Sequence, residues 1–267
     1  MGGEDPMQAR PRLSIVIPAY HEEARLRACL ESALDYLART GTETEVLVVD
    51  DGSTDGTAPI VESLATGRRR DGRLEIRVLR NGRNRGKGYS IKHGVLMARG
   101  DLVLISDADF STPIDELPLL LRAVEEGGHP IAIGSRGLRE SRIVRRQAVW
   151  RETMGRAFNV LVRALTRLPF HDTQCGFKLM RRLEVLPLFR AARIERFAYD
   201  VEILYLARKA GIRVAELPVL WRNAEGSKVN ALVDPLNMLK DVVRVLVRDR
   251  LGRYGAIGRP PAAAGIK

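Results

Sequence analysis

Short apolar runs alternate with helix-like patterns along the first half of the chain. Five runs are continuous, rich in Val, Ile and Leu, and bounded by polar residues or glycine, as is typical of buried parallel strands. They cover residues 13–17, 46–49, 76–79, 102–105 and 131–133. Between them, residues such as Leu26, Leu30 and Leu34 recur at helical spacing. The alternation predicts an α/β fold, with ligands bound by loops at the carboxyl ends of the strands.

The second half of the chain is predicted to be more helical. Helical periodicity covers 144–166, 197–209 and 234–251, and 214–219 is typical of a short strand. The last helix has an apolar stripe, formed by Leu236, Leu239, Val243 and Leu246. It also has a basic stripe, formed by Lys240, Arg244 and Arg248. Two interpretations follow: the helix rests on an anionic membrane surface, or it packs on the sheet with a solvated charged face.

No internal repeat and no long linker divides the chain. We therefore expect a disordered N-terminus at 1–11, one domain at 12–233, an amphipathic basic helix at 234–254 and a disordered tail at 255–267. The tail is rich in Pro, Ala and Gly, a composition that does not build a packed core.

The positive charge of the chain is concentrated in its second half. The 267 residues carry a formal charge of +11, divided into −4 over residues 1–135 and +15 over the remainder. An anionic partner is therefore expected to meet the second half. Nucleic acid is a poor match, because aromatic residues make up only 5% of the chain and no recognition motif is present.

The composition also limits the cellular context. No apolar run reaches the roughly 18 residues that a membrane-spanning helix needs, and residues 1–12 lack the apolar segment of a signal peptide. Cys29 and Cys175 are far apart and in no metal-binding spacing, which excludes a disulfide scaffold or a zinc module. We expect a cytoplasmic protein.

Two carboxylates, Asp107 and Asp109, directly follow the apolar run 102–105 and enclose Ala108. Carboxylates at positions i and i+2 of a loop can face one hard cation, and Mg²⁺ or Mn²⁺ with a diphosphate is a common occupant of such a site. On its own this pattern is weak, because acidic residues are also frequent in solvated loops.

Further chemistry-bearing residues follow other strands. Residues 48–57 form a second acidic strand end with glycines, and residues 15–23 form a third, with a proline, an aromatic and carboxylates. Residues 84–88 open a helix, so free backbone N–H groups and Lys87 are expected to meet phosphate oxygens. Neither a Walker A sequence nor a dinucleotide-type glycine motif is present.

Taken together, residues 15–23, 50–57, 85–88 and 107–109 resemble the family 2 glycosyltransferases in both order and spacing. The resemblance covers residues 12–230 and implies a GT-A fold, a Rossmann-like and mostly parallel sheet flanked by helices. Segments 134–136, 172–178, 197–202 and 221–229 resemble one branch, the polyprenyl-phosphate (dolichyl-phosphate) sugar synthases, and above all its glucosyl-transferring members. His21 stands where that family usually has Asn.

The resemblance implies a role for each matching residue. The nucleotide-binding set is Pro18, Ala19, Tyr20, Glu22, Asp50, Asp51, Gly86, Lys87, Asp107, Ala108 and Asp109. The metal ligands are Asp109 and Asp107. The acceptor side holds Arg136, Arg151, Gln174 and Lys178. A lid over the diphosphate holds Trp221, Arg222, Ser227 and Lys228. The catalytic set is Asp107, Asp109, Arg136, Asp172 and Asp200.

The implied reaction moves a hexose from a nucleotide sugar, UDP-glucose or GDP-mannose, to a polyprenyl phosphate. Such an acceptor is already mostly ionised at neutral pH, since its second pKa is about 6. It therefore needs little help from a general base, and direct displacement implies inversion at the anomeric carbon. The lipid acceptor implies peripheral contact with the cytoplasmic face of a membrane.

Two other functions are considered. A family 2 transferase acting on a saccharide hydroxyl or another lipid would need a committed base, for which Asp172 or Asp200 is the best candidate. A basic nucleic-acid-binding protein is the more distant alternative.

Overall fold

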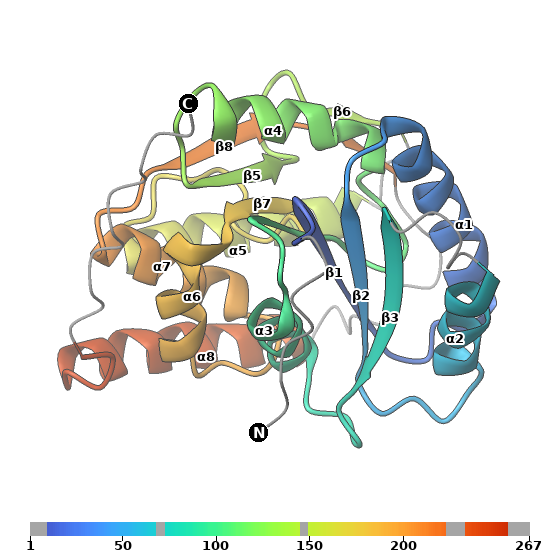
Figure 1. The fold of residues 1–267 in the computed structure, drawn as a ribbon. Helices are drawn as coiled ribbons and strands as arrows, with labels where there is room; N and C mark the ends of the chain where they lie inside the picture. The colour runs from blue at the N-terminus through green and yellow to red at the C-terminus, as the bar shows by residue number, and fades with distance from the viewer. Residues whose placement is uncertain (1–9, 68–72, 145–148, 223–232, 256–267) are drawn as a thin grey trace.

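The computed structural model describes residues 10–67, 73–144, 149–222 and 233–255. Seven strands form one sheet in the order β3-β2-β1-β4-β7-β5-β8, in which only β7 runs antiparallel to its neighbours (Figure 1). The strands are β1 (Leu13–Ala19), β2 (Thr44–Asp50), β3 (Leu74–Arg80), β4 (Leu102–Ile105), β5 (Ile131–Ser135), β7 (Lys178–Arg181) and β8 (Val214–Pro218).

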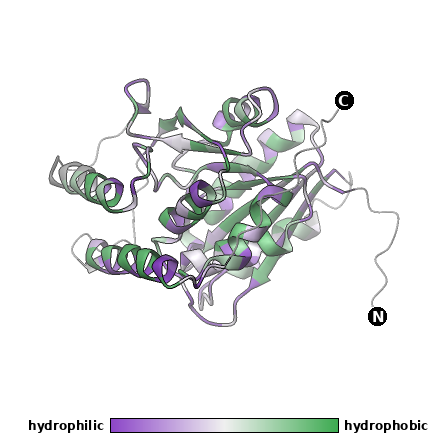
Figure 2. Cartoon of the chain, turned by 90° about the vertical axis from the view of Figure 1, so that its left-hand side faces the viewer, coloured by the Kyte–Doolittle hydropathy of each residue, from purple (hydrophilic) through white to green (hydrophobic). Residues whose placement is uncertain are grey.

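Two helical layers cover the sheet. The helices are α1 (Glu23–Thr40), α2 (Thr57–Gly67), α3 (Lys87–Met97), α4 (Leu117–Glu125), α5 (Val149–Thr166), α6 (Arg182–Ala191), α7 (Tyr199–Lys209) and α8 (Val233–Arg250). Apolar side chains of β1 alternate between the faces: Ile15 and Ile17 pack with α1, α2 and α4, and Val16 packs with α3 and α5 to α8. Figure 2 shows the resulting core as green strands between helices whose outer sides are partly purple.

The parallel register brings several loops to one edge of the sheet. Ala19 at the end of β1 is paired with Asp50 at the end of β2, and Asp50 is paired with Arg80 at the end of β3. β4 is paired with β1 through Val16 and Ile105, so the loop after Ile105 emerges beside them. The three acidic strand ends singled out in the sequence therefore lie together.

The predicted α/β architecture is confirmed, with mostly small shifts of the boundaries. β1, β2 and β3 extend two or three residues beyond the predicted runs, and a 3-10 turn (Ile114–Glu116) precedes α4. The helix expected over 144–166 is observed from Val149, and 145–148 lie outside the described residues. The expected disordered ends also lie almost wholly outside them.

The C-terminal helix α8 packs against α5 and α7 through Val242 and Val245, which are fully buried. The helix therefore packs on the protein as the second interpretation expects, although its main contacts are with these two helices rather than with the sheet. Its opposite side is partly apolar and exposed, at Leu236, Val243, Val247 and Leu251. None of the described helices is long and apolar enough to cross a bilayer.

Two short strands add a second, parallel pair next to the main sheet. They are β6 (Arg142–Ile143) and β9 (Leu220–Trp221). The pair fixes the segment after β5 to the segment after β8, so that Trp221 and Arg222 are held near the end of β5.

Candidate functional site

Asp107 lies in the loop after β4, in contact with the first residue of α3. Its carboxylate is 2.6 Å from Nζ of Lys87. The backbone of Gly176 lies so close that a Cβ there would be 2.2 Å from Oδ2 of Asp107. Burial alone would raise the pKa of Asp107, but the charge of Lys87, followed by those of Lys178 and Arg136, lowers it. Asp107 is therefore an ionised carboxylate in a fixed position.

Asp109 faces a different cation. Its Oδ1 accepts a 2.9 Å hydrogen bond from the N–H of Ser111, and its Oδ2 is 3.4 Å from Nη1 of Arg25. Arg25 is itself held by Glu22, with hydrogen bonds of 2.5 and 3.1 Å. Ala108, between the two acids, is buried. The loop thus holds two carboxylates whose charge is compensated from opposite sides, by α3 and by α1.

These carboxylates suit a hard divalent cation. Among the described residues, no three His, Cys, Asp or Glu side chains are grouped to hold a metal ion. Asp107 and Asp109 are carboxylates, and a cation that takes its other ligands from phosphate oxygens and water, as Mg²⁺ and Mn²⁺ do, fits such a pair. In this structure each acid is paired with a different cationic side chain, Asp107 with Lys87 and Asp109 with Arg25.

Pro18 and Ala19 end β1, next to the loop that follows β2. Asp50 is the last residue of β2, is buried, and accepts a 3.1 Å hydrogen bond from the N–H of Ser53. Tyr20 stacks on the ring of His21 with centroids 4.0 Å apart. The candidate nucleoside-binding residues of these two loops are therefore brought together.

Hydrogen bonds join the loop after β1 to the loop after β2. The N–H of His21 donates to Oγ of Ser53 at 2.9 Å, and the N–H of Glu22 donates to Oγ1 of Thr57 at 2.8 Å. His21 adopts a φ of 52°, a left-handed conformation that Asn and His tolerate better than most residues. This explains why a residue of this kind fits here.

Asp51 organises the loop before α3. Its carboxylate accepts hydrogen bonds from Nδ2 of Asn81 at 2.7 Å and from the N–H groups of Arg85 at 3.0 Å and Gly86 at 2.7 Å. The expectation that the N–H groups of this loop are free for phosphate is therefore wrong for Arg85 and Gly86. Gly86 has a φ of 106°, and a Cβ on it would be 2.6 Å from the carbonyl oxygen of Glu195, so only glycine fits.

Arg136 and Asp172 form a bidentate ion pair at the end of β5. Nε and Nη2 of Arg136 donate to the two carboxylate oxygens at 2.6 and 3.0 Å, and the Arg136 N–H donates at 3.1 Å. Burial would raise the pKa of Asp172, but the charge and hydrogen bonds of Arg136 lower it to about 2. The N–H of Gln174 also donates to Asp172, and Arg136 lies 5.6 Å from the ring centroid of Trp221.

Lys178 and Asp200 form a second, buried ion pair. Nζ of Lys178 is 2.6 Å from Oδ1 of Asp200 and also donates to the carbonyl of Cys175. The side chains are only 2% and 4% exposed. Burial raises the pKa of Asp200 despite the opposing charge of Lys178. The opposite charges of the pair compensate each other, and Lys178 is too buried to meet a ligand in this structure.

The remaining candidates lie near the lid or outside the described residues. The N–H of Arg222 donates to the carbonyl of Ser111 at 2.7 Å, which ties the segment after β9 to the Asp109 loop. Ser227 and Lys228 lie outside the described residues. Arg151 belongs to α5, but its side chain is not described.

Comparison with known proteins agrees with this arrangement. Residues 14–184 match the family described as glycosyl transferase family 2. The chain is a family 2 glycosyltransferase. It is 36% identical over 249 residues to a dolichyl-phosphate beta-glucosyltransferase of Dictyostelium discoideum, covering 90% of this chain and 75% of that protein. A Drosophila melanogaster protein of the same name is 37% identical, with coverages of 91% and 76%.

Solved structures of other glycosyltransferases share the fold. Mannosyl-3-phosphoglycerate synthase from Rubrobacter xylanophilus has a TM-score of 0.64 at 21% identity, over 95% of this chain and 78% of that one. Glucosyl-3-phosphoglycerate synthase from Mycobacterium tuberculosis, solved with Mn²⁺, UDP and glucosyl-3-phosphoglycerate, has a TM-score of 0.61 at 19% identity, with coverages of 95% and 82%. The predicted GT-A type of α/β fold is confirmed.

Sequence reasoning misses several residues that build the transferase site. Arg25 belongs to no recognisable sequence motif. The only signal for it is that it lies three residues after Glu22, a spacing at which helical side chains contact each other. Asn81 is also missed; besides Asp51, it contacts Nδ1 of His93 at 2.8 Å. Nothing in the linear spacing brings Gly176 against Asp107, because that contact joins the loops after β4 and before β7.

Gly176→Ala tests whether the position of Asp107 matters for transfer. The added methyl group would push Asp107 away from its contact with Lys87, and a misplacement of about 1 Å in a reacting site costs about a hundredfold in rate. We expect a fall in kcat/KM of that size with little change in melting temperature. Gly155→Ala on α5 is the control, since a Cβ there meets nothing within 4 Å. Equal activity of the two variants would contradict this role of Asp107.

Proposed function

We propose that the transferase moves glucose from UDP-glucose to a polyprenyl phosphate of the dolichyl type. The observation that carries the choice of substrates is the 33–37% identity, over about 90% of the chain, to several proteins named dolichyl-phosphate beta-glucosyltransferase. The geometry supports the same reaction, because an acidic loop suited to a metal-bound diphosphate and an arginine suited to a phosphate lie along one edge of the sheet.

On the donor side, the residues after β1 and β2 bind the nucleoside, and the loop after β4 binds the diphosphate. Asp107 and Asp109 hold Mg²⁺ or Mn²⁺, which when bound would neutralise the charge that develops on the leaving nucleoside diphosphate. Lys87 adds a fixed positive charge beside Asp107. Arg222, whose backbone is tied to the Asp109 loop, belongs with Ser227 and Lys228 to a lid over the diphosphate.

On the acceptor side, Arg136 presents its remaining donors to the acceptor phosphate. The paired Asp172 orients the guanidinium, and the Trp221 ring limits its movement from another side. Gln174 and Arg151 are assigned to the same side. Lys178 supports this side structurally, since its ammonium group binds Asp200 and the carbonyl of Cys175. With the acceptor oxygen aligned opposite the leaving group, transfer inverts the anomeric centre and gives a β-linked product from an α-linked donor.

The environments of the two candidate bases, Asp172 and Asp200, support an acceptor that needs no general base. Asp172 is a weak base because its pKa is lowered to about 2 and both its oxygens bind Arg136. Asp200 is buried and bound to Lys178, so it has no route to an acceptor hydroxyl in this structure. A polyprenyl phosphate, which is ionised at neutral pH, therefore suits this site better than the saccharide hydroxyl of the alternative function.

The lipid acceptor requires contact with a membrane, and α8 offers a surface for it. Leu236, Val243, Val247 and Leu251 lie 7, 4 and 4 residues apart on one exposed stripe, and the buried Val242 and Val245 anchor the opposite side. We place the transferase peripherally, at the cytoplasmic face of a membrane, with this stripe inserted among the lipids.

The proposal is tested by offering several donors with one acceptor. Purified protein, Mn²⁺ and a polyprenyl phosphate in detergent are incubated with labelled UDP-glucose, GDP-mannose or UDP-galactose, and the lipid product is extracted and its anomeric configuration determined by NMR. We expect a glucosylated lipid phosphate with β configuration from UDP-glucose and at least about tenfold less product from the others. If no donor gives a lipid product, and a parallel incubation with a saccharide acceptor gives a product with an acidic limb in its rate profile, the result would support the alternative.

A further inference from the structure

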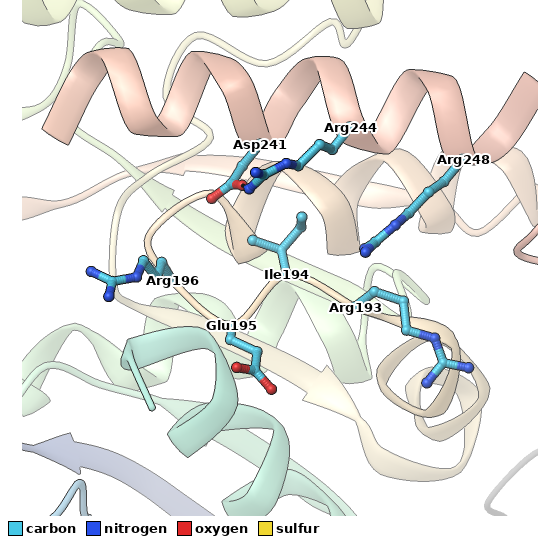
Figure 3. Close-up of a pocket in the computed structure, with 7 residues that line it drawn as sticks. All are labelled: Arg193, Ile194, Glu195, Arg196, Asp241, Arg244 and Arg248. Carbon is cyan, nitrogen blue, oxygen red and sulfur yellow. Dashed lines mark hydrogen bonds and ion pairs between the residues drawn. The ribbon is translucent and has the colours of Figure 1, made fainter. Parts of the chain in front are cut away.

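A pocket of about 260 Å³ lies between α8 and the loop that joins α6 to α7 (Figure 3). Its lining is Arg193, Ile194, Glu195, Arg196, Asp241, Arg244 and Arg248. An adjoining hollow shares Arg193 and Arg248 and adds Arg253. Arginines thus dominate a concave surface that plays no part in the donor or acceptor site described above.

The two carboxylates of the pocket are already occupied. Asp241 binds Nη1 of Arg244 at 2.7 Å, and Glu195 points away toward α3, where it binds Nη2 of Arg85 at 2.6 Å (Figure 3). Glu202, behind the loop, accepts the backbone N–H groups of residues 193 and 194 and the hydroxyl of Tyr254. The acidic groups near this surface therefore have other partners.

The other arginines have no such partner. Within the part of the chain that the structure describes, no carboxylate lies within 4 Å of the guanidinium groups of Arg193, Arg196, Arg248 or Arg253. Arg248 lies beside the hydroxyl of Tyr254, and its Nη1 is buried without a hydrogen-bond partner. A buried donor without an acceptor is costly, and so is a group of like charges. Arg193 also acts on Lys92 of α3, whose pKa is lowered by burial and by the charge of Arg193 against the opposing charges of Glu202 and Glu195.

We propose that this pocket is a second anion site, which binds a phosphate group between Arg193 and Arg248. Guanidinium groups suit phosphate because they donate in pairs to its oxygens. The exposed apolar stripe of α8 borders the basic face that carries Arg244 and Arg248. A phospholipid headgroup is thus the occupant that this position favours, with its acyl chains beside Val247 and Leu251. This lipid source rests on the membrane contact proposed above, whereas binding of phosphate itself does not.

The first experiment titrates inorganic phosphate into the full-length protein by calorimetry. Arg248→Gln and Arg193→Gln are expected to weaken binding at least tenfold. Arg250→Gln, which removes the same charge from α8 outside the pocket, should leave it unchanged. Melting temperatures check that each variant is folded. No saturable binding, or equal weakening by Arg250→Gln, would overturn the proposal.

The second experiment identifies the source of the phosphate group. Sedimentation with vesicles of phosphatidylcholine is compared with vesicles that also contain phosphatidylglycerol. If the headgroup is the ligand, phosphatidylglycerol increases binding, and Arg248→Gln but not Arg250→Gln removes the increase. If phosphatidylglycerol increases vesicle binding equally in both variants, and binding of inorganic phosphate still depends on Arg248, the pocket is a site for a soluble phosphate group.

A third measurement separates this site from the transferase reaction. Transfer to acceptor dissolved in detergent should be the same in Arg248→Gln and in the unmodified protein. If the protein shows no transferase activity, the proposed function is refuted. If phosphate binding still depends on Arg248 in that case, the second site remains supported. A loss of detergent-phase activity in both pocket variants would mean that the pocket belongs to the reaction site, and would overturn its assignment as a second site.

Discussion

Asp109→Asn is expected to remove most of the transferase activity while the protein stays folded. The amide keeps the shape of the side chain and its contact with Ser111 but loses the negative charge that a divalent cation requires. Loss of one group that stabilises developing charge in a reacting site costs about 10²–10³ in rate. The fold should survive because Asp109 is 19% exposed, and Arg25 retains its two hydrogen bonds to Glu22.

The measurement combines steady-state kinetics with a metal titration. The variant should show lower kcat and a higher apparent KM for Mn²⁺, and its melting temperature should stay within a few degrees of the unmodified protein. Asp115→Asn, which removes an exposed acid from the 3-10 turn, is the matched control and should change neither value. Full activity of the unmodified protein in excess chelator would contradict a metal role for the loop after β4.

Most of the framework of this site could be predicted from the sequence. Parallel strands buried on both faces are continuous apolar runs, and their order fixes which loops meet at the carboxyl edge. Asp50, Asp107 and the residues after β1 are therefore recognisable as strand ends from the amino-acid pattern alone. The antiparallel β7 is missed because it has only four residues and includes Lys178, whose charge is hidden by a contact with α7.

What could not be predicted depends on contacts between distant loops. Asp51 follows Asp50 and is equally acidic, yet it binds the backbone 34 and 35 residues later and so serves the loop rather than a ligand. Asp172 and Asp200 are both acidic candidates for a base, and only their partners Arg136 and Lys178 show that each carboxylate is neutralised. Similarly, α6 is not predicted, and Pro187 within it is a residue that usually marks the end of a helix.

The separation of donor and acceptor sites leads to the second large prediction. Arg136 follows β5 and Asp50 ends β2, and β1, β4 and β7 lie between those strands. With strands about 4.8 Å apart, the two residues are roughly 19 Å from each other across the sheet. Arg136→Ala should therefore impair use of the acceptor without weakening nucleotide binding, and Asp50→Ala should do the reverse.

The expected size of the effect of Arg136→Ala follows from the contact with the acceptor phosphate that is lost. A charge-assisted hydrogen bond between arginine and phosphate contributes roughly 1.5–3 kcal/mol, which corresponds to about a ten- to hundredfold change in the acceptor KM or in kcat. Because Asp172 is 2% exposed, Arg136→Ala also leaves a buried carboxylate without its partner, which destabilises the protein. The double variant Arg136→Ala/Asp172→Asn removes that unpaired charge and separates the loss of the phosphate contact from the loss of stability.

The two substrates are measured separately. Calorimetric titration with UDP and Mn²⁺ gives nucleotide affinity, and acceptor-dependent kinetics give KM and kcat for the polyprenyl phosphate. In the ion pair the pKa of Asp172 is about 2, but Arg136→Ala removes the charge that lowers this pKa, and burial then raises it. The effect of the single variant should therefore change with pH, whereas that of the double variant, which has no carboxylate at position 172, should not. If both the single and the double variant weakened UDP binding as much as acceptor use, Arg136 would belong to the donor site, and the acceptor phosphate would have to be bound elsewhere in the basic half.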